Sequence, residues 1–384
     1  MKSLLGIVLP LIIFGVFGVA IWYVAYRLNT LFALNHRWPL YVGITLLFVV
    51  SVFGMVTGLR STDSAIGAFN TASGYLFGFF AFLLLSLLVL QVAQLVWNPV
   101  GQTSAWTVLA VAFGITAAGA LWANSVRVGK TVIPIEGLEQ EVTIMQLSDV
   151  HVGHQRGRDH LEKIVRKTNR HKPDLVLITG DLVDAETALQ PGVLAPLADL
   201  NAPAFYVRGN HENFVGPARV VHLITEQGVR VLRNEVVETH GIYLVGLDYM
   251  RPDNKTFDPH PSSSKRTIEN TLPTIPLKDD KPSVLMHHSP VGAEYVAAKG
   301  IDLMVAGHTH GGQMFPGTLL APLFFPFTKG LYNEGNTNVF VSQGAGTFGP
   351  RIRLGTANEI NLLRLTPKQS PGGSRLPLVT ARHL

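Results

Sequence analysis

The chain has 384 residues, enough for two or three domains, and 47% of them are hydrophobic while only 15% are charged. It contains no cysteine, which excludes disulfides and thiolate metal sites, so any metal ion must be held by histidine and by carboxylate or amide oxygens. The net charge of +5 comes without a basic run interleaved with aromatic residues, so we expect no nucleic-acid partner.

The first 130 residues carry seven charged side chains, although the whole chain has 31 Lys and Arg and 26 Asp and Glu. Four uncharged apolar stretches in this part are long enough to cross a bilayer, which takes about 20 helical residues. The stretches are roughly 4–26, 40–59, 74–96 and 106–123. We therefore predict that residues 1–124 form an all-α, four-helix transmembrane region that anchors the protein in the lipid bilayer, making it a multi-pass integral membrane protein.

Four crossings would place both ends of this region on one side of the membrane. Four basic residues would share that side and two would lie opposite, which favours a cytoplasmic soluble half by the positive-inside rule. The four are Lys2, Arg60, Arg127 and Lys130, and the two are Arg27 and Arg37.

The second half of the chain has an ordinary soluble composition. We expect residues 125–140 to be a linker, residues 141–365 a folded domain and residues 366–384 a flexible tail. Within the domain, apolar strand-like runs alternate with helical stretches, which predicts an α/β fold with helices outside a layered sheet. In such sheets, ligands gather at the carboxyl ends of strands.

Five short polar boxes follow the predicted strands. They read Ser-Asp-Val-His at 148–151, Gly-Asp-Leu-Val-Asp at 180–184, Gly-Asn-His-Glu at 209–212, His-His-Ser-Pro at 287–290 and Gly-His-Thr-His at 307–310. One box alone says little, because Gly-Asp is common in turns and Gly-Asn-His-Glu is compatible with a helix cap. In this order, however, the boxes supply the oxygen and imidazole ligands that two neighbouring divalent ions require.

In order and spacing, the boxes resemble those of the calcineurin-like metallophosphoesterases, over about residues 141–365. The run Gly-His-Thr-His-Gly-Gly-Gln at 307–313 and the stretch 342–355 are similar to a membrane-associated branch that includes UDP-2,3-diacylglucosamine pyrophosphohydrolase-like enzymes. The resemblance implies a four-layer αββα sandwich, a binuclear centre of Mn, Fe, Zn, Mg or Co, and hydrolysis of a phosphoester or pyrophosphate.

The resemblance also implies a role for individual residues. Asp181 would bridge the two metals, and His211 would donate a proton to the leaving oxygen while a hydroxide between the ions attacks phosphorus. His288 fits the family's His-x-Pro pattern, whereas the adjacent His287 should point to the opposite face. The implied ligands of the first metal, besides the bridge, are Asp149, His151 and His310, and those of the second are Asn210 and His308, with His288 a ligand of the centre.

Several neighbouring residues have two readings. Asp184 and Glu212 either orient metal ligands or are solvated turn carboxylates. We expect His154 to be a surface histidine, and Arg156, Arg351 and Arg353 to be surface or packing residues, with phosphate binding as the alternative. The apolar loop at 314–327 either covers the domain core or enters the membrane surface.

These features predict a membrane-anchored, metal-dependent phosphoesterase, acting on a lipid-linked substrate because the anchor holds the site near the bilayer. Two alternatives stay open. The first is a phosphodiesterase for a soluble nucleotide, and the second is a transporter or scaffold whose soluble domain is inactive.

Overall fold

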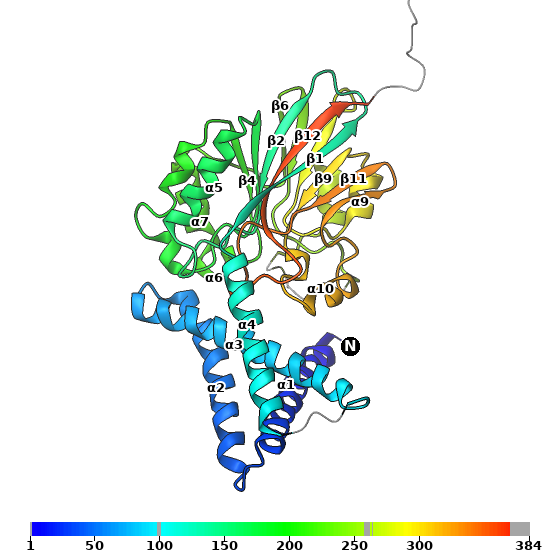
Figure 1. Ribbon diagram of the computed structural model, residues 1–384. Coiled ribbons are helices and arrows are strands. Elements are labelled where there is room, and N and C mark those ends of the chain that lie inside the picture. The colour runs from blue at the N-terminus through cyan, green and yellow to red at the C-terminus, as the bar shows by residue number, and fades with distance from the viewer. Residues whose placement is uncertain (1, 98–100, 257–261, 263, 369–384) are drawn as a thin grey trace, which may run out of the picture.

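The computed structural model describes residues 2–97, 101–256, 262 and 264–368, with side chains from residue 14 onward. A domain built on two sheets stands on one end of a bundle of long helices (Figure 1). The bundle and the domain meet around the upper ends of α2 and α4 and the beginning of α3.

Four long helices make up the bundle among the described residues: α1 (Lys2–Phe32), α2 (Trp38–Thr57), α3 (Ser64–Ala93) and α4 (Gln102–Trp122). Three of them, α2 with the 3₁₀ turn that extends it, α3 and α4, are long and apolar enough to cross a membrane. Three of the four predicted spans are thus found within the described part of the chain, and the fourth stays a prediction. The remaining predicted span, 4–26, falls in α1, and the side chains of residues 2–13 lie outside that part.

Helix α3 begins ten residues before the predicted span at 74–96. The Asp63 carboxylate caps the helix by accepting hydrogen bonds from the backbone N–H groups of Ala65 and Ile66, at 2.7 and 3.2 Å. The additional turns contain Asn70 and Ser73, which are buried against α2 and the soluble domain. The sequence pattern missed these turns because a helix that packs against protein does not need to be uniformly apolar.

The soluble domain contains two six-stranded mixed sheets. The first sheet has the order β1-β12-β2-β3-β4-β5, and the second has the order β10-β11-β9-β8-β7-β6. Strands of the first sheet are β1 (Val126–Ile135), β12 (Asn358–Pro367), β2 (Val142–Leu147), β3 (Leu175–Thr179), β4 (Ala204–Val207) and β5 (Arg230–Val231). Strands of the second are β10 (Gly330–Glu334), β11 (Thr337–Val341), β9 (Leu303–Ala306), β8 (Ser283–Met286), β7 (Ile242–Gly246) and β6 (Glu235–Thr239).

The sheets face each other across a shared apolar core, and helices cover their outer faces. In β2, Ile144 points into the core between the sheets, whereas Met145 and Leu147 point into the core beneath the helices. This alternation is the two-residue period of a strand that is buried on both faces. Helices α5 (Arg158–Arg170) and α7 (Pro217–Glu226) cover the first sheet, and α8 (Ile268–Thr271) and α9 (Ala293–Ala298) cover the second. The predicted four-layer αββα sandwich is confirmed.

Part of the segment that was expected to be a linker is instead a strand. Residues 126–135 form β1, which pairs in parallel with β12 along its whole length. Ile133 and Ile135 are buried between the sheets. The alternating apolar residues of this edge strand are separated by Arg127, Lys130 and Thr131, which is why its composition resembled a linker. The expected tail lies outside the described residues from position 369 onward.

The bundle and the domain are joined by close packing. Ile352, from the loop before β12, is fully buried in the apolar cluster formed by the membrane helices. A Cβ on Gly119 of α4 would lie 2.7 Å from Cγ2 of Ile352, so only glycine admits this approach without a shift. The Arg353 N–H donates to the Gly119 carbonyl at 3.1 Å, and the Trp122 indole donates to the Thr356 carbonyl at 3.0 Å. The membrane helices therefore hold the loop that precedes β12.

Candidate metal centre

The five polar boxes follow the carboxyl ends of β2, β3, β4, β8 and β9, where neighbouring parallel strands bring them together. Several box residues adopt a left-handed backbone conformation, which is uncommon outside glycine and concentrates at functional sites. Those with φ between 49° and 71° are Asp149, His151, Asp181, His308 and His310. The boxes are therefore sharp turns.

Two glycines allow these turns to approach one another. A Cβ on Gly209 would lie 2.2 Å from Oδ1 of Asp181, and a Cβ on Gly307 would lie 2.2 Å from Oδ2 of Asp149. Any side chain at either position would displace a carboxylate. Glycine is therefore required for the close approach of backbone to these two acidic groups.

One group of candidate ligands consists of Asp149, His151 and His310, all buried. The Nε2 atoms of the two histidines lie 3.1 Å apart, and Nε2 of His310 lies 3.4 Å from Oδ1 of Asp149. The ligand atoms thus converge on one point although the residues lie about 160 positions apart in the chain. The Asp149 carboxylate is held in place by the Ser148 hydroxyl at 2.6 Å and by the backbone N–H of His308 at 3.0 Å.

A second group consists of Asp181, His288 and His308. Nε2 of His288 lies 3.0 Å from Oδ2 of Asp181 and 3.0 Å from Nδ1 of His308. The Nδ1–H of His288 donates to the Thr179 carbonyl at 2.8 Å, which leaves the Nε2 lone pair directed at the centre. Such a hydrogen bond on the far nitrogen is what orients a metal-binding histidine.

Asn210 and His287 differ in whether their side-chain polar atoms have hydrogen-bond partners. The Asn210 side-chain oxygen is buried and has no hydrogen-bond partner among the described residues. A buried amide oxygen without a partner costs free energy, and a cation at this position would satisfy it. His287, by contrast, is bound on both nitrogens by the backbone of Ser289 and Met250, and burial lowers its pKa to about 4. His287 therefore packs as a neutral structural residue.

The charge balance of the cluster also fits divalent cations. Asp149 and Asp181 are at most 2% exposed, and within the described part of the chain only histidines lie within ion-pair distance of either carboxylate. Burial raises the pKa of Asp149. Burial also acts to raise the pKa of Asp181, but the nearby His288 and His211 outweigh it and hold the pKa well below its usual range. Buried carboxylates of this kind are stabilised by a metal ion.

His211 lies beside the second group and makes a different set of contacts. Its Nδ1 lies 2.5 Å from Oδ1 of Asp184, and its Nε2 lies 3.8 Å from Oδ2 of Asp181. Burial acts to lower the pKa of His211, but the carboxylates of Asp181 and Asp184 outweigh it and raise the pKa to about 10. The rings of Phe214 and Phe348 stand edge-on to the imidazole, with centroids 5.0 and 5.2 Å away. The two carboxylates thus favour the protonated form of His211, and Asp184 orients its ring.

Two supporting residues, Glu212 and Arg353, had roles that the sequence left open. The buried Glu212 carboxylate accepts hydrogen bonds from the backbone N–H groups of the Asp181 and Asn210 turns, including Leu182 at 2.8 Å and Gly209 at 2.9 Å. Arg353 is fully buried and donates to the His310 carbonyl at 2.8 Å. The partners of both residues come from distant segments, so no local sequence signal could have identified these contacts.

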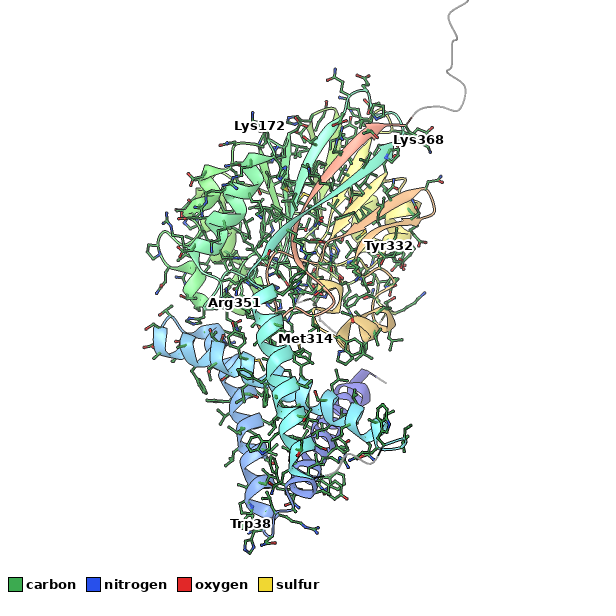
Figure 2. The ribbon with its side chains drawn as sticks, viewed as in Figure 1. Trp38, Lys172, Met314, Tyr332, Arg351 and Lys368 are labelled. Atoms are coloured by element: carbon green, nitrogen blue, oxygen red, sulfur yellow. The ribbon has the colours of Figure 1, made fainter. Side chains whose placement is uncertain are left out.

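His154, which was expected at the surface, and Arg156 and Arg351, which were expected at the surface or in packing, lie at the junction with the membrane helices. Arg156 is buried and donates to the Ala123 carbonyl at the end of α4, at 2.8 Å. His154 is half-buried, with Nε2 2.8 Å from the Ser61 carbonyl. Arg351 donates to the Gln155 carbonyl at 2.8 Å and lies where the domain meets the bundle (Figure 2). These three side chains fasten the domain to its anchor.

Comparisons with known proteins agree with this geometry. Residues 142–312 match the family model described as calcineurin-like phosphoesterase. An uncharacterized metallophosphoesterase from Aquifex aeolicus is 33% identical over 63% of this chain and 92% of its own length. A bovine transmembrane protein with metallophosphoesterase domain is 33% identical over 58% of this chain and 52% of its own. An uncharacterized metallophosphoesterase from Helicobacter pylori is 35% identical over 63% of this chain, which spans 64% of that relative's length.

Among solved structures, the calcineurin-like phosphoesterase YfkN from Bacillus subtilis aligns with a TM-score of 0.35 and 16% identity, over 54% of this chain and 83% of the other. That likeness is too low to support an argument about function. The family model and the sequence relatives, together with two groups of buried ligands at the strand ends, are sufficient. The chain belongs to the calcineurin-like metallophosphoesterase family of metal-dependent phosphoester hydrolases.

Proposed function

We propose that the protein is a membrane-anchored phosphoesterase with two metal ions, and that it cleaves a phosphoester or pyrophosphate bond of a lipid-linked substrate. The observation that carries the proposal is the pair of adjoining ligand groups, with the unpartnered Asn210 oxygen and the paired His211 and Asp184 beside them. Two ions held side by side are the arrangement that clamps the attacking and leaving oxygens of a displacement at phosphorus.

The ligands divide between the two ions according to their grouping. Asp149, His151 and His310 would hold the first ion. The second group, with Asn210, would hold the second ion, and Asp181 would serve both because one carboxylate between two cations offsets their repulsion. When bound, the ions would lower the pKa of a water molecule and stabilise charge on the phosphoryl oxygens.

His211 is the residue that we assign to proton donation. Its Nδ1–H is directed to Asp184, and its Nε2, which lies 3.8 Å from Oδ2 of Asp181, would face the leaving oxygen. Metal ions on Asp181 would offset the charge of that carboxylate, which leaves Asp184 as the group that keeps His211 protonated. An imidazolium fixed in this way can protonate a departing alkoxide or phosphate oxygen.

The membrane helices support a lipid-linked substrate and a cytoplasmic site. Arg60, Arg127 and Lys130 belong to segments at the domain end of the bundle, whereas Arg37 precedes Trp38, which lies at the far end (Figure 2). This distribution favours the cytoplasm for the catalytic domain. The metal groups lie on the side of the domain that joins the helices, so a substrate held in the bilayer would need to move little to reach them.

The proposal is tested with the full-length protein in detergent. Metal-depleted protein should hydrolyse neither bis(p-nitrophenyl) phosphate nor a long-chain phosphoester, and added Mn²⁺ should restore both activities. Asp181→Asn should abolish both, while the matched surface variant Asp159→Asn should behave as wild type. Turnover that persists without metal, or in Asp181→Asn, would reject the proposal. A marked preference for soluble nucleotides over the lipid ester would instead support the nucleotide phosphodiesterase.

A further inference from the structure

A cavity of about 410 Å³ lies between the membrane helices and the candidate metal centre. Its volume is within the range of small-molecule sites, roughly 300–1,000 Å³. The C-terminal part of α2, the 3₁₀ turn after it and the middle of α3 form one wall, and loops of the catalytic domain form the other. The transmembrane anchor and the catalytic domain thus enclose the cavity together.

The two ends of the cavity have opposite chemistry. One end is lined by His151, Asp184 and His211, which belong to the metal centre or contact it. The other end is lined by aliphatic and aromatic side chains of the membrane helices, including Val52, Val56 and Phe77. An amphiphile whose polar group carries phosphorus and whose remainder is hydrocarbon has the same distribution of chemistry.

The polar side chains on the wall are mostly already engaged. Asn70 donates to the Met55 carbonyl of α2 at 2.8 Å and accepts from Gln155 at 3.2 Å, and Gln155 also donates to the Gly349 carbonyl at 3.0 Å. Two lining side chains keep a buried nitrogen without a hydrogen-bond partner in the described part of the chain: Nη1 of Arg156 and Nδ1 of His151. The cavity therefore offers mainly apolar surface away from the metal centre.

The apolar end opens toward the region where the bilayer would lie. Val56 is 60% exposed and Phe53, on the same helix, is 62% exposed, although both belong to a helix apolar enough to span a membrane. Residues of this kind face lipid when the helix is inserted. A chain already in the bilayer could thus enter the cavity sideways, past α2, without crossing water.

We propose that this cavity holds one hydrocarbon chain of the substrate, with the substrate's phosphoryl group at the metal centre. The inference deepens the proposed phosphoesterase function and rests on it. It assigns Val52, Val56 and Phe77 to substrate selection, and it makes part of the transmembrane anchor a component of the substrate-binding site.

The test is a series of phosphoesters with one alkyl chain of increasing length, hydrolysed by the full-length protein with Mn²⁺ in detergent. Each methylene buried in the cavity should raise kcat/KM by about fourfold until the cavity is full, after which the values should level off. Val56→Trp should fill the apolar end and flatten this dependence. The matched control Val50→Trp changes an exposed residue of the same helix that does not line the cavity, so it should keep the wild-type dependence.

Hydrolysis of bis(p-nitrophenyl) phosphate, which has no chain, separates this inference from damage to the protein. The chain-length dependence of each blocking variant is therefore measured relative to its own rate on this ester, and Val52→Phe is a milder blocking variant should Val56→Trp not fold. The inference would be overturned if the wild type showed no dependence of kcat/KM on chain length, or if a folded blocking variant kept the wild-type dependence. Either result would leave the phosphoesterase function standing. Failure of the metal-loaded wild type to hydrolyse any phosphoester would reject the proposed function itself.

Discussion

The contact between His211 and Asp184 leads to the sharpest prediction. Asp184→Asn keeps the size of the side chain but removes the charge that faces Nδ1 of His211 at 2.5 Å. A hydrogen bond to a charged group contributes roughly 1.5–3 kcal/mol, so we expect kcat to fall about 10- to 150-fold if that contribution stabilises the protonated imidazole in the transition state. The free energy of unfolding should change less, because the Asp184 side chain is partly exposed.

The loss should depend on the leaving group. An alkyl ester needs a proton on its departing oxygen, whereas p-nitrophenolate leaves without one, so the variant should lose far more activity on the alkyl ester. The variant should also change the pH profile. Asp184 raises the pKa of His211, so its removal lowers that pKa, and activity that requires the protonated ring should then decline at lower pH than in the wild type.

The assay is kcat against pH for both esters at saturating Mn²⁺. Glu186→Gln is the matched control, because it removes a carboxylate two positions away that pairs at the surface with Arg219 and should contribute little. Equal losses on both esters, or an unshifted alkaline limb of the profile, would contradict the assignment of His211 as the proton donor.

Three further predictions follow from the structure. Metal removal should lower the Tm, and ions at about 100 times their Kd should restore about 2.7 kcal/mol of stability for each occupied site, measured by thermal unfolding with and without chelator. Gly119→Val should crowd Ile352 and lower the free energy of unfolding by about 1–3 kcal/mol, with a lower Tm and reduced turnover. In the control Gly114→Val, on the same helix, an added Cβ meets no atom within 4 Å, so this variant should be tolerated. Equal effects of the two variants would contradict the packing argument. Leu323 and Phe324 are exposed, so changing both to Ser should weaken binding to lipid vesicles while sparing hydrolysis of a soluble ester, and unchanged vesicle binding would indicate that this loop does not enter the membrane.

The exposed loop illustrates a limit of the sequence pattern. The apolar residues at 314–327 were read as one unit, either a lid or a membrane contact. In the structure they divide: the Phe325 ring packs edge-on against His308 with centroids 5.4 Å apart, whereas Phe324 next to it is 61% exposed. Composition could not separate the two, because both are phenylalanines in an irregular segment without a periodic pattern.

The fold was largely predictable because its signals are local. Continuous apolar runs such as Leu175–Thr179, each followed by a polar box, indicate buried parallel strands whose ends meet at one edge. Strand β1 was missed because it is an edge strand with charged residues between its apolar ones. The start of α3 was missed because the helix packs there against the catalytic domain, where Asn70 and Ser73 are buried among protein atoms and not in lipid.

The candidate site was predictable as a set of side chains but not as a network. The alternation of adjacent residues allowed only one of His287 and His288 to reach the site, and the family's His-x-Pro pattern selected His288; the structure places only His288 among the ligand groups. The roles of Asp184, Glu212 and Arg353 depend on partners that come from other boxes and loops. Such contacts follow from the packing of the whole domain, so they could be read only from the structure.

The central claim is that residues from five separate turns hold two metal ions side by side. Anomalous diffraction from crystals of the Mn²⁺-loaded protein tests it most directly. The account predicts two peaks roughly 3.5–4 Å apart, with Asp181 between them. Asn210 should bind the same ion as His288 and His308. A single peak, or none among these residues, would contradict it.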